Sequence, residues 1–344
     1  METELFVIND IEKDHDKLER AAGLIKNGSL VAFPTETVYG LGANALDGQA
    51  VRRIFDVKGR PMDNPLILHI PDMLWLKRYC LDIPPEAYKL AERFWPGPLT
   101  MVLKRKSTVP DEVTAGLHTV AVRCPNHKVA LRLIRLVGAP VAAPSANISG
   151  RPSPTKAGHV LYDLSGKIAG VVDGGSCMVG VESTIVDLSA KPYKILRPGG
   201  VTPEQLSEVL GPVGLDSGVL QAPKDSETVK APGMKYRHYA PKAQVILLMG
   251  DIEKAAGFVN RLDRETTGVL CFDEEIPHFK GKYILSYGKR DDYAAQAQKL
   301  FHCLRALDEK RVKTIYARCP ESSGVGLAVS NRLLKASGYQ IVEV

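Results

Sequence analysis

The chain has 344 residues, of which 44% are hydrophobic and 24% charged, and this composition is typical of a globular protein with two domains. Its formal net charge of +6 fits an anionic substrate or a nucleic-acid product without requiring either. The N-terminus has no basic segment followed by an apolar one, and no apolar run approaches about 18 residues, so we expect neither a signal peptide nor a membrane span and predict a cytoplasmic protein.

The first 210 residues alternate short apolar segments with amphipathic ones, which predicts an α/β domain. Asp47 is a favourable N-cap and Gly59 a favourable C-terminal residue, so the helix between them has the clearest ends. The predicted strands cover residues 29–33, 66–70, 99–103, 120–123, 141–143, 170–172, 183–188 and 194–197. The predicted helices cover residues 16–26, 47–58, 84–94 and 203–210, and another begins after Asn126.

The composition changes at residue 211. Residues 211–242 begin with Gly, Pro, Ser and charged residues without periodicity, which is typical of a linker. The last part, residues 231–241, holds two tyrosines, a histidine, a lysine and an arginine between prolines. A passive tether needs none of these side chains, so we expect this part to have a function.

Alternation of strands and helices resumes after the linker and predicts a small, parallel α/β domain. Its predicted strands cover residues 245–249, 268–272, 283–286 and 314–317, and its helices include one from residue 291 and one at 327–336. We therefore predict domains at residues 1–210 and 243–344, joined by the linker at 211–242.

Four segments carry polar or basic side chains, and three of them open where a predicted strand ends. The segments are residues 33–42, 58–69, 143–147 and 181–184, and Arg197 follows the last of them. Ligands of α/β proteins are bound at this edge of the sheet. The four segments together therefore predict one binding site.

The side chains of these segments fit phosphate handling. Lys58 and Arg60 supply positive charge, and a second pair of arginines, Arg123 and Arg197, can each hold a carboxylate or a phosphate through two hydrogen bonds. Short donors come from Ser145 and Asn147, which point to one side if their segment is extended. Such a set stabilises a phosphoryl group in transfer by position and charge, without a protein nucleophile.

Each residue also has a simpler interpretation. Lys58 and Arg60 can complement a helix C-terminus, and Ser145 can be a turn residue, as can Asn147. Arg123 can form a structural ion pair, and a histidine such as His69, at the end of an apolar strand, is more often a core residue than a ligand-binding one. The hypothesis of a phosphate-binding site therefore depends on these residues occurring together and not on any one of them.

Other motifs are absent from the sequence or weak. There is no Walker-type phosphate loop, no nucleophile elbow and no zinc signature, and we expect no protein-held metal. Residues 40–45 match the loose dinucleotide fingerprint but do not directly follow a predicted strand, so we interpret their glycines as tight-turn residues. The six cysteines form no Cys-x-x-Cys pair and are expected to be reduced thiols.

Long stretches of the sequence resemble the YrdC family of threonylcarbamoyl-AMP synthases. In the first domain, over residues 14–210, the similarity is carried by Pro-Thr-Glu-Thr-Val-Tyr-Gly-Leu from Pro34, Lys-Gly-Arg-Pro from Lys58 and Pro-Ser-Ala-Asn from Pro144. Residues 232–241 and 326–335 are similar to the long, two-domain form. The resemblance implies a twisted α/β domain with a concave basic face, followed by a smaller Rossmann-like domain.

The resemblance also implies a reaction, in which L-threonine, bicarbonate and ATP, with Mg²⁺, give threonylcarbamoyl-AMP and pyrophosphate. A partner complex, the tRNA threonylcarbamoyl-transferase, would then pass the group to an adenosine of tRNA. Whether this chain contacts tRNA itself stays open. No membrane partner is expected.

Roles for individual residues follow from the resemblance alone. Lys58, Arg60, Ser145 and Asn147 would form a catalytic tetrad at the nucleotide. ATP would also be bound by Asn64, Thr119, Arg197 and His238, and threonine by Thr37, His69, Arg123, Ala143 and Ser183. Residues 235–239 of the linker would close over the nucleotide as a lid.

Two other functions fit parts of the sequence. Carbamoyl transfer of the hydrogenase-maturation type uses a related domain, but it is accompanied by zinc-binding Cys-x-x-Cys pairs that this sequence lacks. An RNA-binding module would use a basic concave surface, but it usually presents stacking aromatic residues, which do not cluster in the basic segments of the first domain.

Overall fold

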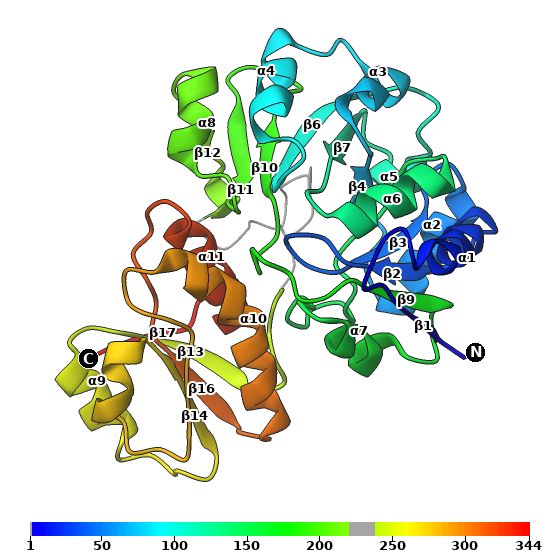
Figure 1. Ribbon diagram of the computed structural model, residues 1–344. Coiled ribbons are helices and arrows are strands. Elements are labelled where there is room, and N and C mark those ends of the chain that lie inside the picture. The colour runs from blue at the N-terminus through cyan, green and yellow to red at the C-terminus, as the bar shows by residue number, and fades with distance from the viewer. Residues whose placement is uncertain (1, 220–237) are drawn as a thin grey trace.

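The computed structural model describes residues 2–219 and 238–344, which form two α/β domains, each with its own sheet (Figure 1). A mixed sheet of 12 strands organises the first domain. Its strands follow the spatial order β1 (Glu4–Val7), β9 (Gly170–Asp173), β2 (Val31–Phe33), β3 (Gly40–Asn44), β8 (Val141–Ala142), β4 (Ile67–His69), β7 (Thr119–Arg123), β6 (Leu99–Arg105), β10 (Thr184–Asp187), β11 (Lys194–Arg197) and β12 (Gly214–Leu215), with β5 (Cys80–Leu81) beside β6.

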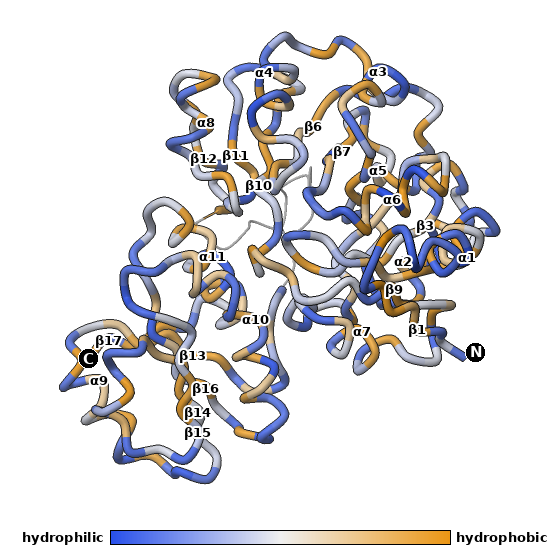
Figure 2. Tube along the Cα trace, in the orientation of Figure 1, coloured by the Kyte–Doolittle hydropathy of each residue, from blue (hydrophilic) through white to orange (hydrophobic). Residues whose placement is uncertain are grey.

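The helices of the first domain pack against this sheet through their apolar faces, which are coloured orange in Figure 2. α2 begins after Asp47, whose side chain accepts from the amides of Gln49 and Ala50, and it ends at Gly59 in the left-handed conformation, as predicted. The helices are α1 (His15–Lys26), α2 (Gly48–Lys58), α3 (Leu76–Tyr79), α4 (Pro85–Phe94), α5 (Asp111–Thr114), α6 (Lys128–Val137), α7 (Ala157–Leu164) and α8 (Pro203–Leu210).

The two faces of the central strands differ in what they contact. Because side chains alternate along a strand, Leu66, Leu68 and their counterparts on neighbouring strands join the main core. The opposite face carries a separate apolar cluster with one residue from each of β4, β6, β7, β10 and β11, namely Ile67, Val102, Ala121, Ile185 and Leu196. We call this the concave face, because the site described below opens from it.

The second domain is a sheet of five strands that are all parallel, which confirms the predicted class. Its strands follow the order β15 (Tyr283–Ser286), β14 (Thr267–Cys271), β16 (Thr314–Ala317), β13 (Gln244–Met249) and β17 (Ile341–Glu343). Its helices are α9 (Ile252–Val259), α10 (Tyr293–Glu309) and α11 (Gly326–Ser337). Helices α10 and α11 lie on the side that faces the first domain (Figure 1).

Two predictions about individual segments are wrong. Residues 40–44 form strand β3 instead of a tight turn, and a Cβ on Gly42 would lie 2.8 Å from Val141 and 2.9 Å from the Phe33 ring. Position 42 therefore requires glycine because its neighbours leave no room for a side chain. Helix α6 begins after His127, not after Asn126.

The predicted linker at 211–242 is only partly described. Its first residues include β12, which pairs with β11 at the edge of the first sheet, and a short 3-10 helix at Ser217–Val219. Residues 220–237 lie outside the described residues, and with them most of the predicted lid. The domain boundaries stay predictions. In the described part of the chain, no helix is long and apolar enough to cross a membrane.

Candidate active site

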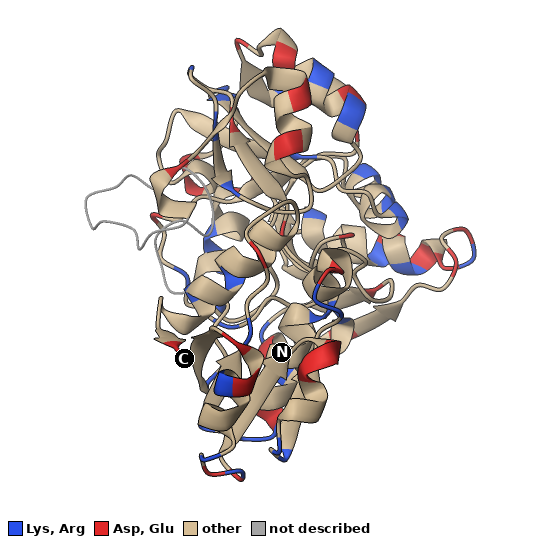
Figure 3. Ribbon diagram, turned by 90° about the vertical axis from the view of Figure 1, so that its left-hand side faces the viewer, with Lys and Arg blue, Asp and Glu red and all other residues tan. Residues whose placement is uncertain are grey.

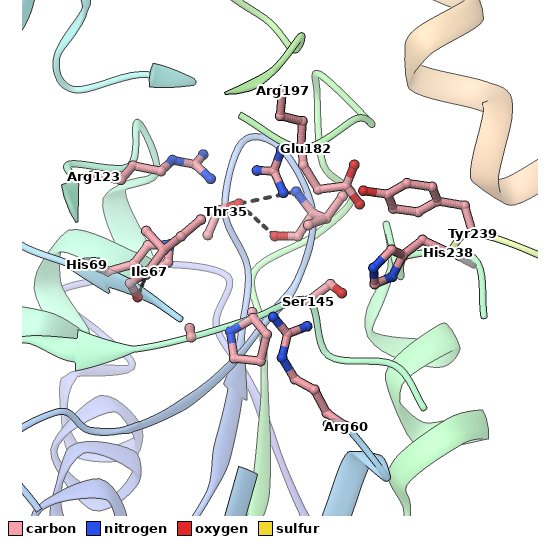
Figure 4. Close-up of a pocket in the computed structure, with 14 residues that line it drawn as sticks. Thr35, Arg60, Ile67, His69, Arg123, Ser145, Glu182, Arg197, His238 and Tyr239 are labelled. Carbon is pink, nitrogen blue, oxygen red and sulfur yellow. Dashed lines mark hydrogen bonds between the residues drawn. The ribbon is translucent and has the colours of Figure 1, made fainter. Parts of the chain in front are cut away.

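A pocket lies where the central strands of the first sheet meet the second domain (Figure 4). Parallel strands β4 and β7 are in register, so His69 and Arg123 end side by side at its wall. The remaining wall comes from the loops after β2, α2 and β8 and before β10, from the end of β11, and from two residues of the predicted linker. The polar residues at the wall are Thr35, Arg60, His69, Arg123, Ser145, Glu182, Arg197, His238 and Tyr239.

Arg123 is a buried guanidinium that points into the pocket (Figure 4). Its Nη2 lies 2.8 Å from Oε1 of Glu36, and both side chains are almost fully buried. Nevertheless, neither Nε nor Nη2 of Arg123 has an acceptor with hydrogen-bond geometry among the described residues. Buried charged donors are normally satisfied, so this arrangement fits an anion that binds in the pocket.

His69 supplies a neutral polar group beside Arg123. Its Nδ1 lies 3.2 Å from the carbonyl of Ile67, and its ring packs edge-on against Phe33. Burial, together with the charge of Arg123, lowers the pKa of His69 to about 3. The imidazole is therefore uncharged at neutral pH and can accept or donate a hydrogen bond without adding charge.

Lys58 and Asn147 lie behind the wall and shape it. The Nζ of Lys58 donates to the carbonyls of Ser145, at 2.5 Å, and of Asn147. The amide of Asn147 donates to the carbonyls of Ile148 and Arg151, at 2.8 and 2.9 Å. Burial, reinforced by Arg60, lowers the pKa of Lys58 well below its usual value.

The predicted tetrad therefore divides into two pairs. Arg60 and Ser145 reach the pocket, whereas Lys58 and Asn147 hold the loop that presents Ser145. We expected Ser145 and Asn147 to point to one side of an extended segment. The segment instead turns, and Asn147 bonds back to its own loop.

Arg60 forms the wall near Ser145 and is held by the chain that follows it. Its Nε and Nη2 donate to the carbonyl of Asn64 at 3.2 and 3.1 Å, and Nη2 also donates to Pro65 at 3.1 Å. The side chain of Asn64 is buried, and neither its oxygen nor its nitrogen has a hydrogen-bond partner among the described residues. Asn64 does not itself line the pocket, but it lies next to Arg60 of the wall, and its unbonded amide is suited to a polar ligand.

Arg197 forms the opposite wall and is positioned by Ser183. Its Nε donates to the Ser183 carbonyl at 3.1 Å and its Nη2 to the hydroxyl at 3.2 Å, and Thr100 holds that hydroxyl at 2.7 Å. Burial lowers the pKa of Arg197 to about 10, so the group stays charged at neutral pH. Ser183 lies behind the wall, where we expected direct contact with threonine.

Thr37 also lies behind the wall. Its hydroxyl is 2.9 Å from that of Thr35, and it is Thr35 that reaches the pocket. Ala143 does reach the pocket, but its amide donates to the Ile67 carbonyl at 3.0 Å, which leaves its carbonyl for a ligand.

Thr119 lies at the other end of β7 from Arg123, about 13 Å away at about 3.3 Å per residue. It lines a second hollow, with Lys104 and His118. Alternation places Thr119, Ala121 and Arg123 on the same, concave face. The structure therefore does not bring Thr119 to the main pocket, but it lies further along the same surface.

The structure adds residues that the sequence did not single out. Thr35 and Glu182 belong to the wall, although each lies next or nearly next to a residue that was named, and Tyr239, from the predicted lid, belongs to it as well. Tyr239 is held in the left-handed region, with φ of 67°, and stacks on Phe301 of α10 at 5.4 Å between ring centroids. His238 lies beside it, and burial lowers the pKa of His238 well below its usual value.

Comparison with known proteins identifies the family. Residues 23–199 match the family described as "Telomere recombination", which carries YrdC in its name, and residues 201–338 match "Threonylcarbamoyl-AMP synthase, C-terminal domain". Threonylcarbamoyl-AMP synthase of Pyrococcus abyssi is 48% identical over 98% of this chain and 99% of its own length. The chain belongs to the threonylcarbamoyl-AMP synthase family.

Further members agree with this family assignment. The Bacillus subtilis threonylcarbamoyl-AMP synthase is 44% identical over 98% of this chain and 97% of its own length. A crystal structure of a Pyrococcus abyssi relative, complexed with L-threonine, covers 100% of both chains with a TM-score of 0.92 and 47% identity. The predicted resemblance and fold are confirmed, and the chain is a nucleotidyltransferase that forms threonylcarbamoyl-AMP.

Proposed function

We propose that the pocket binds L-threonine and ATP side by side and joins them through a carbamate. The observation that carries the proposal is Arg123, a buried guanidinium aimed into the pocket with hydrogen-bond donors left over. The carboxylate of threonine is a planar anion that fits such a fork. The relative complexed with L-threonine supports the same ligand.

Threonine would lie at the end of the pocket formed by β4 and β7. Arg123 binds its carboxylate, and the neutral His69 and the Thr35 hydroxyl offer hydrogen bonds to its polar groups. The carbonyl of Ala143 faces the amine. Thr37 and Ser183 contribute by holding Thr35 and Arg197 in place.

ATP would lie across the concave face from Arg197 towards Arg60. Arg60, Arg197 and the Ser145 hydroxyl surround the phosphates, and Asn64 offers a buried amide. Lys58 and Asn147 maintain the loop of Ser145. Thr119 would be reached only by the far end of an extended nucleotide, because it lies about 13 Å from Arg123.

The reaction needs positioning and charge more than a protein nucleophile. The amine of threonine attacks bicarbonate, which loses water, and the resulting carbamate oxygen attacks the α-phosphorus of ATP as pyrophosphate leaves. Arg60 and Arg197 stabilise the charge that develops on the phosphates. A carbamate is unstable in water, so the walls must exclude solvent until it reacts.

Magnesium would enter with ATP, bound to its phosphates. In residues 2–219 and 238–344, no group of three or more His, Cys, Asp or Glu side chains could hold a metal. Glu182, the carboxylate at the wall, is paired with Arg332 at 2.7 Å. These residues do not fit a protein-held ion, and no step above depends on one.

His238 and Tyr239 would cover the bound nucleotide. They are the part of the predicted lid that lies within the described residues, and both are largely buried at the pocket wall. The adenylate would then pass to the complex that modifies tRNA. Basic and acidic residues are interspersed over the visible helices (Figure 3), which gives no support to RNA binding as the main function.

One assay separates these functions. Pyrophosphate release from ATP is measured with and without L-threonine and with and without bicarbonate. We expect release only when both are present. Release that is independent of threonine, or RNA binding without ATP turnover, would contradict the proposal.

A further inference from the structure

Glu182 presents a problem for a pocket that binds anions. It is 7% exposed at the wall, next to Ser183, whose carbonyl and hydroxyl hold Arg197. Burial by itself would raise the pKa of Glu182, but Arg332 and Arg197 together lower it. A negative carboxylate therefore lies beside a cation that an anionic ligand needs.

Arg332, which belongs to α11 of the second domain, neutralises this carboxylate. Its side chain is fully buried, and its Nε lies 2.7 Å from Oε2 of Glu182. The other carboxylate oxygen of Glu182 accepts from the hydroxyl of Ser153. Glu182 is thus bound from two sides, and neither partner is Arg197.

Two further contacts hold the Arg332 guanidinium. Its Nη1 donates to Oδ1 of Asn331 at 2.9 Å, and its Cζ lies 5.3 Å from the ring centre of Tyr239, whereas Nη2 has no hydrogen-bond partner among the described residues. Arg332 therefore contacts two residues of the wall, Glu182 of the first domain and Tyr239 of the predicted linker. Figure 4 shows Glu182 and the Tyr239 hydroxyl pointing towards each other above His238.

We propose that Arg332 is a positioning residue of the active site, which holds Glu182 so that Arg197 stays directed at the phosphates of the nucleotide. Arg197 is the other cation that lowers the pKa of Glu182, so without Arg332 the carboxylate can pair with Arg197, and such a pair would remove a cation from the pocket. The second domain then completes the binding site through α11. This inference depends on the proposed use of the pocket for ATP.

The second domain itself offers little else to a nucleotide. Ligands of parallel α/β sheets bind at the carboxyl ends of the strands. Here Arg318, after β16, donates to Glu275 at 3.0 Å and to the carbonyls of Leu248 and Gly250 at 2.8 and 2.9 Å. The Arg318 side chain therefore occupies the carboxyl ends of β13 and β16, where a ligand would otherwise bind. This agrees with a domain that acts on the pocket through α11.

The test compares Arg332→Met with Arg332→Met/Glu182→Gln in the full chain. The single variant leaves a buried carboxylate beside Arg197, so we expect the KM for ATP to rise at least tenfold. The double variant also lacks the ion pair, but it has no carboxylate to capture Arg197. We expect its KM to return to within about threefold of that of the unmodified chain.

A purely structural role predicts a different pattern. If Arg332 only docked the domains, both variants would lose the same ion pair and would be equally impaired, and that result would overturn the proposal. Affinity for a non-hydrolysable ATP analogue, measured by calorimetry, provides a readout independent of turnover. If Arg332→Met does not fold, Arg332→Gln, which is also uncharged, is compared alone and with Glu182→Gln in the same way.

A matched control is Arg305→Met. Arg305 of α10 forms another buried ion pair between the domains, with Asp163 at 2.7 Å, and it lies outside the pocket wall. We expect a lower melting temperature and an unchanged KM for ATP. If the unmodified chain itself shows no threonine-dependent pyrophosphate release, the proposed function fails, which is distinct from failure of this inference.

Discussion

At the scale of single residues, side chains at the pocket wall and directly behind it are in states that are unfavourable without a ligand. Arg123 is buried with donors that lack acceptors in the described structure, and Asn64 is buried with its whole amide unbonded. An unsatisfied buried polar group costs about 1–3 kcal/mol. A ligand that satisfies these groups recovers that energy on binding, so the strain favours occupancy.

Replacing Arg123 tests its role directly. We expect Arg123→Gln to raise the KM for threonine about 10- to 100-fold, since a hydrogen bond to a charged group contributes about 1.5–3 kcal/mol. Arg123→Lys keeps the positive charge but lacks the paired donors of the guanidinium, so it should recover only part of the lost affinity for threonine. Steady-state pyrophosphate release against threonine concentration measures both. An unchanged KM in folded Arg123→Gln would refute the assignment.

The sequence could not rank residues within one loop. Thr35 and Thr37, or Glu182 and Ser183, lie so close in the sequence that only the local backbone decides which one reaches the pocket. The resemblance named Thr37 and Ser183, whereas the structure places them behind the wall. Arg60, His69, Arg123, Ser145, Arg197 and His238 all line one pocket in the structure, and their roles stay predictions.

At the scale of elements, hydrophobic patterning predicted the strands that carry a buried side chain on nearly every position, such as β4 and β7. It failed for β3, where Gly40 and Gly42 replace the apolar residues that mark a strand. It also failed for β5 and β12, which have two residues each and are too short to show a period. These strands are defined by their hydrogen bonds to neighbouring strands, and the sequence alone does not show which strands will be neighbours.

Helix α11 supports a prediction about pH. Lys335 lies one turn after Arg332 and interacts electrostatically with Arg197 and Glu182 of the wall. Burial, together with Arg332 and Arg197, lowers the pKa of Lys335 to about 7. At pH 8 the free chain therefore holds Lys335 mostly neutral, and an incoming phosphate, which favours the charged form, raises its pKa again.

We expect ATP binding at pH 8 to take up as much as one proton, and ATP affinity to fall as the pH rises above 7. In the unfolded chain the lysine keeps its proton up to its ordinary pKa of 10.5, so this group makes the free chain more stable as the pH rises from 7 towards that value. Calorimetry in buffers of different ionisation enthalpy measures the uptake. Lys335→Met should reduce it, and equal uptake in that variant would contradict the prediction.

At the scale of the whole molecule, apolar packing joins the two domains in addition to the ion pairs described above. Val38 and Val181 of the first domain belong to the apolar core of the second, together with Tyr239. Gly180 directly precedes Val181 and has a φ of 80°. It has no room for a side chain, because a Cβ there would lie 2.3 Å from the Cα of Gln298 in α10. No periodicity in the sequence predicts such a contact between residues more than 100 positions apart.

Gly180→Ala is expected to separate the domains. The left-handed conformation costs a non-glycine residue about 1–2 kcal/mol, and the clash is with backbone that cannot move aside. We expect a melting temperature several degrees lower, a larger radius of gyration in X-ray scattering and loss of activity. Gly23→Ala, in α1 with nothing within 4 Å of the added Cβ, is the matched control and should unfold at the same or a higher temperature. Unchanged scattering in Gly180→Ala would disprove this account of docking.

The contact between Glu182 and Arg332 also has a consequence for biosynthesis. Arg332 is made 122 residues after Leu210, the last residue of α8, so the pocket cannot be complete when the first domain has been synthesised. At about 5–20 residues per second, about 6–24 s pass between synthesis of these two residues. During that interval the first domain can fold on the ribosome, yet Glu182 still has no Arg332 to bind. We therefore expect a chain without α11 to bind ATP weakly, and synthesis of α11 to complete the nucleotide site.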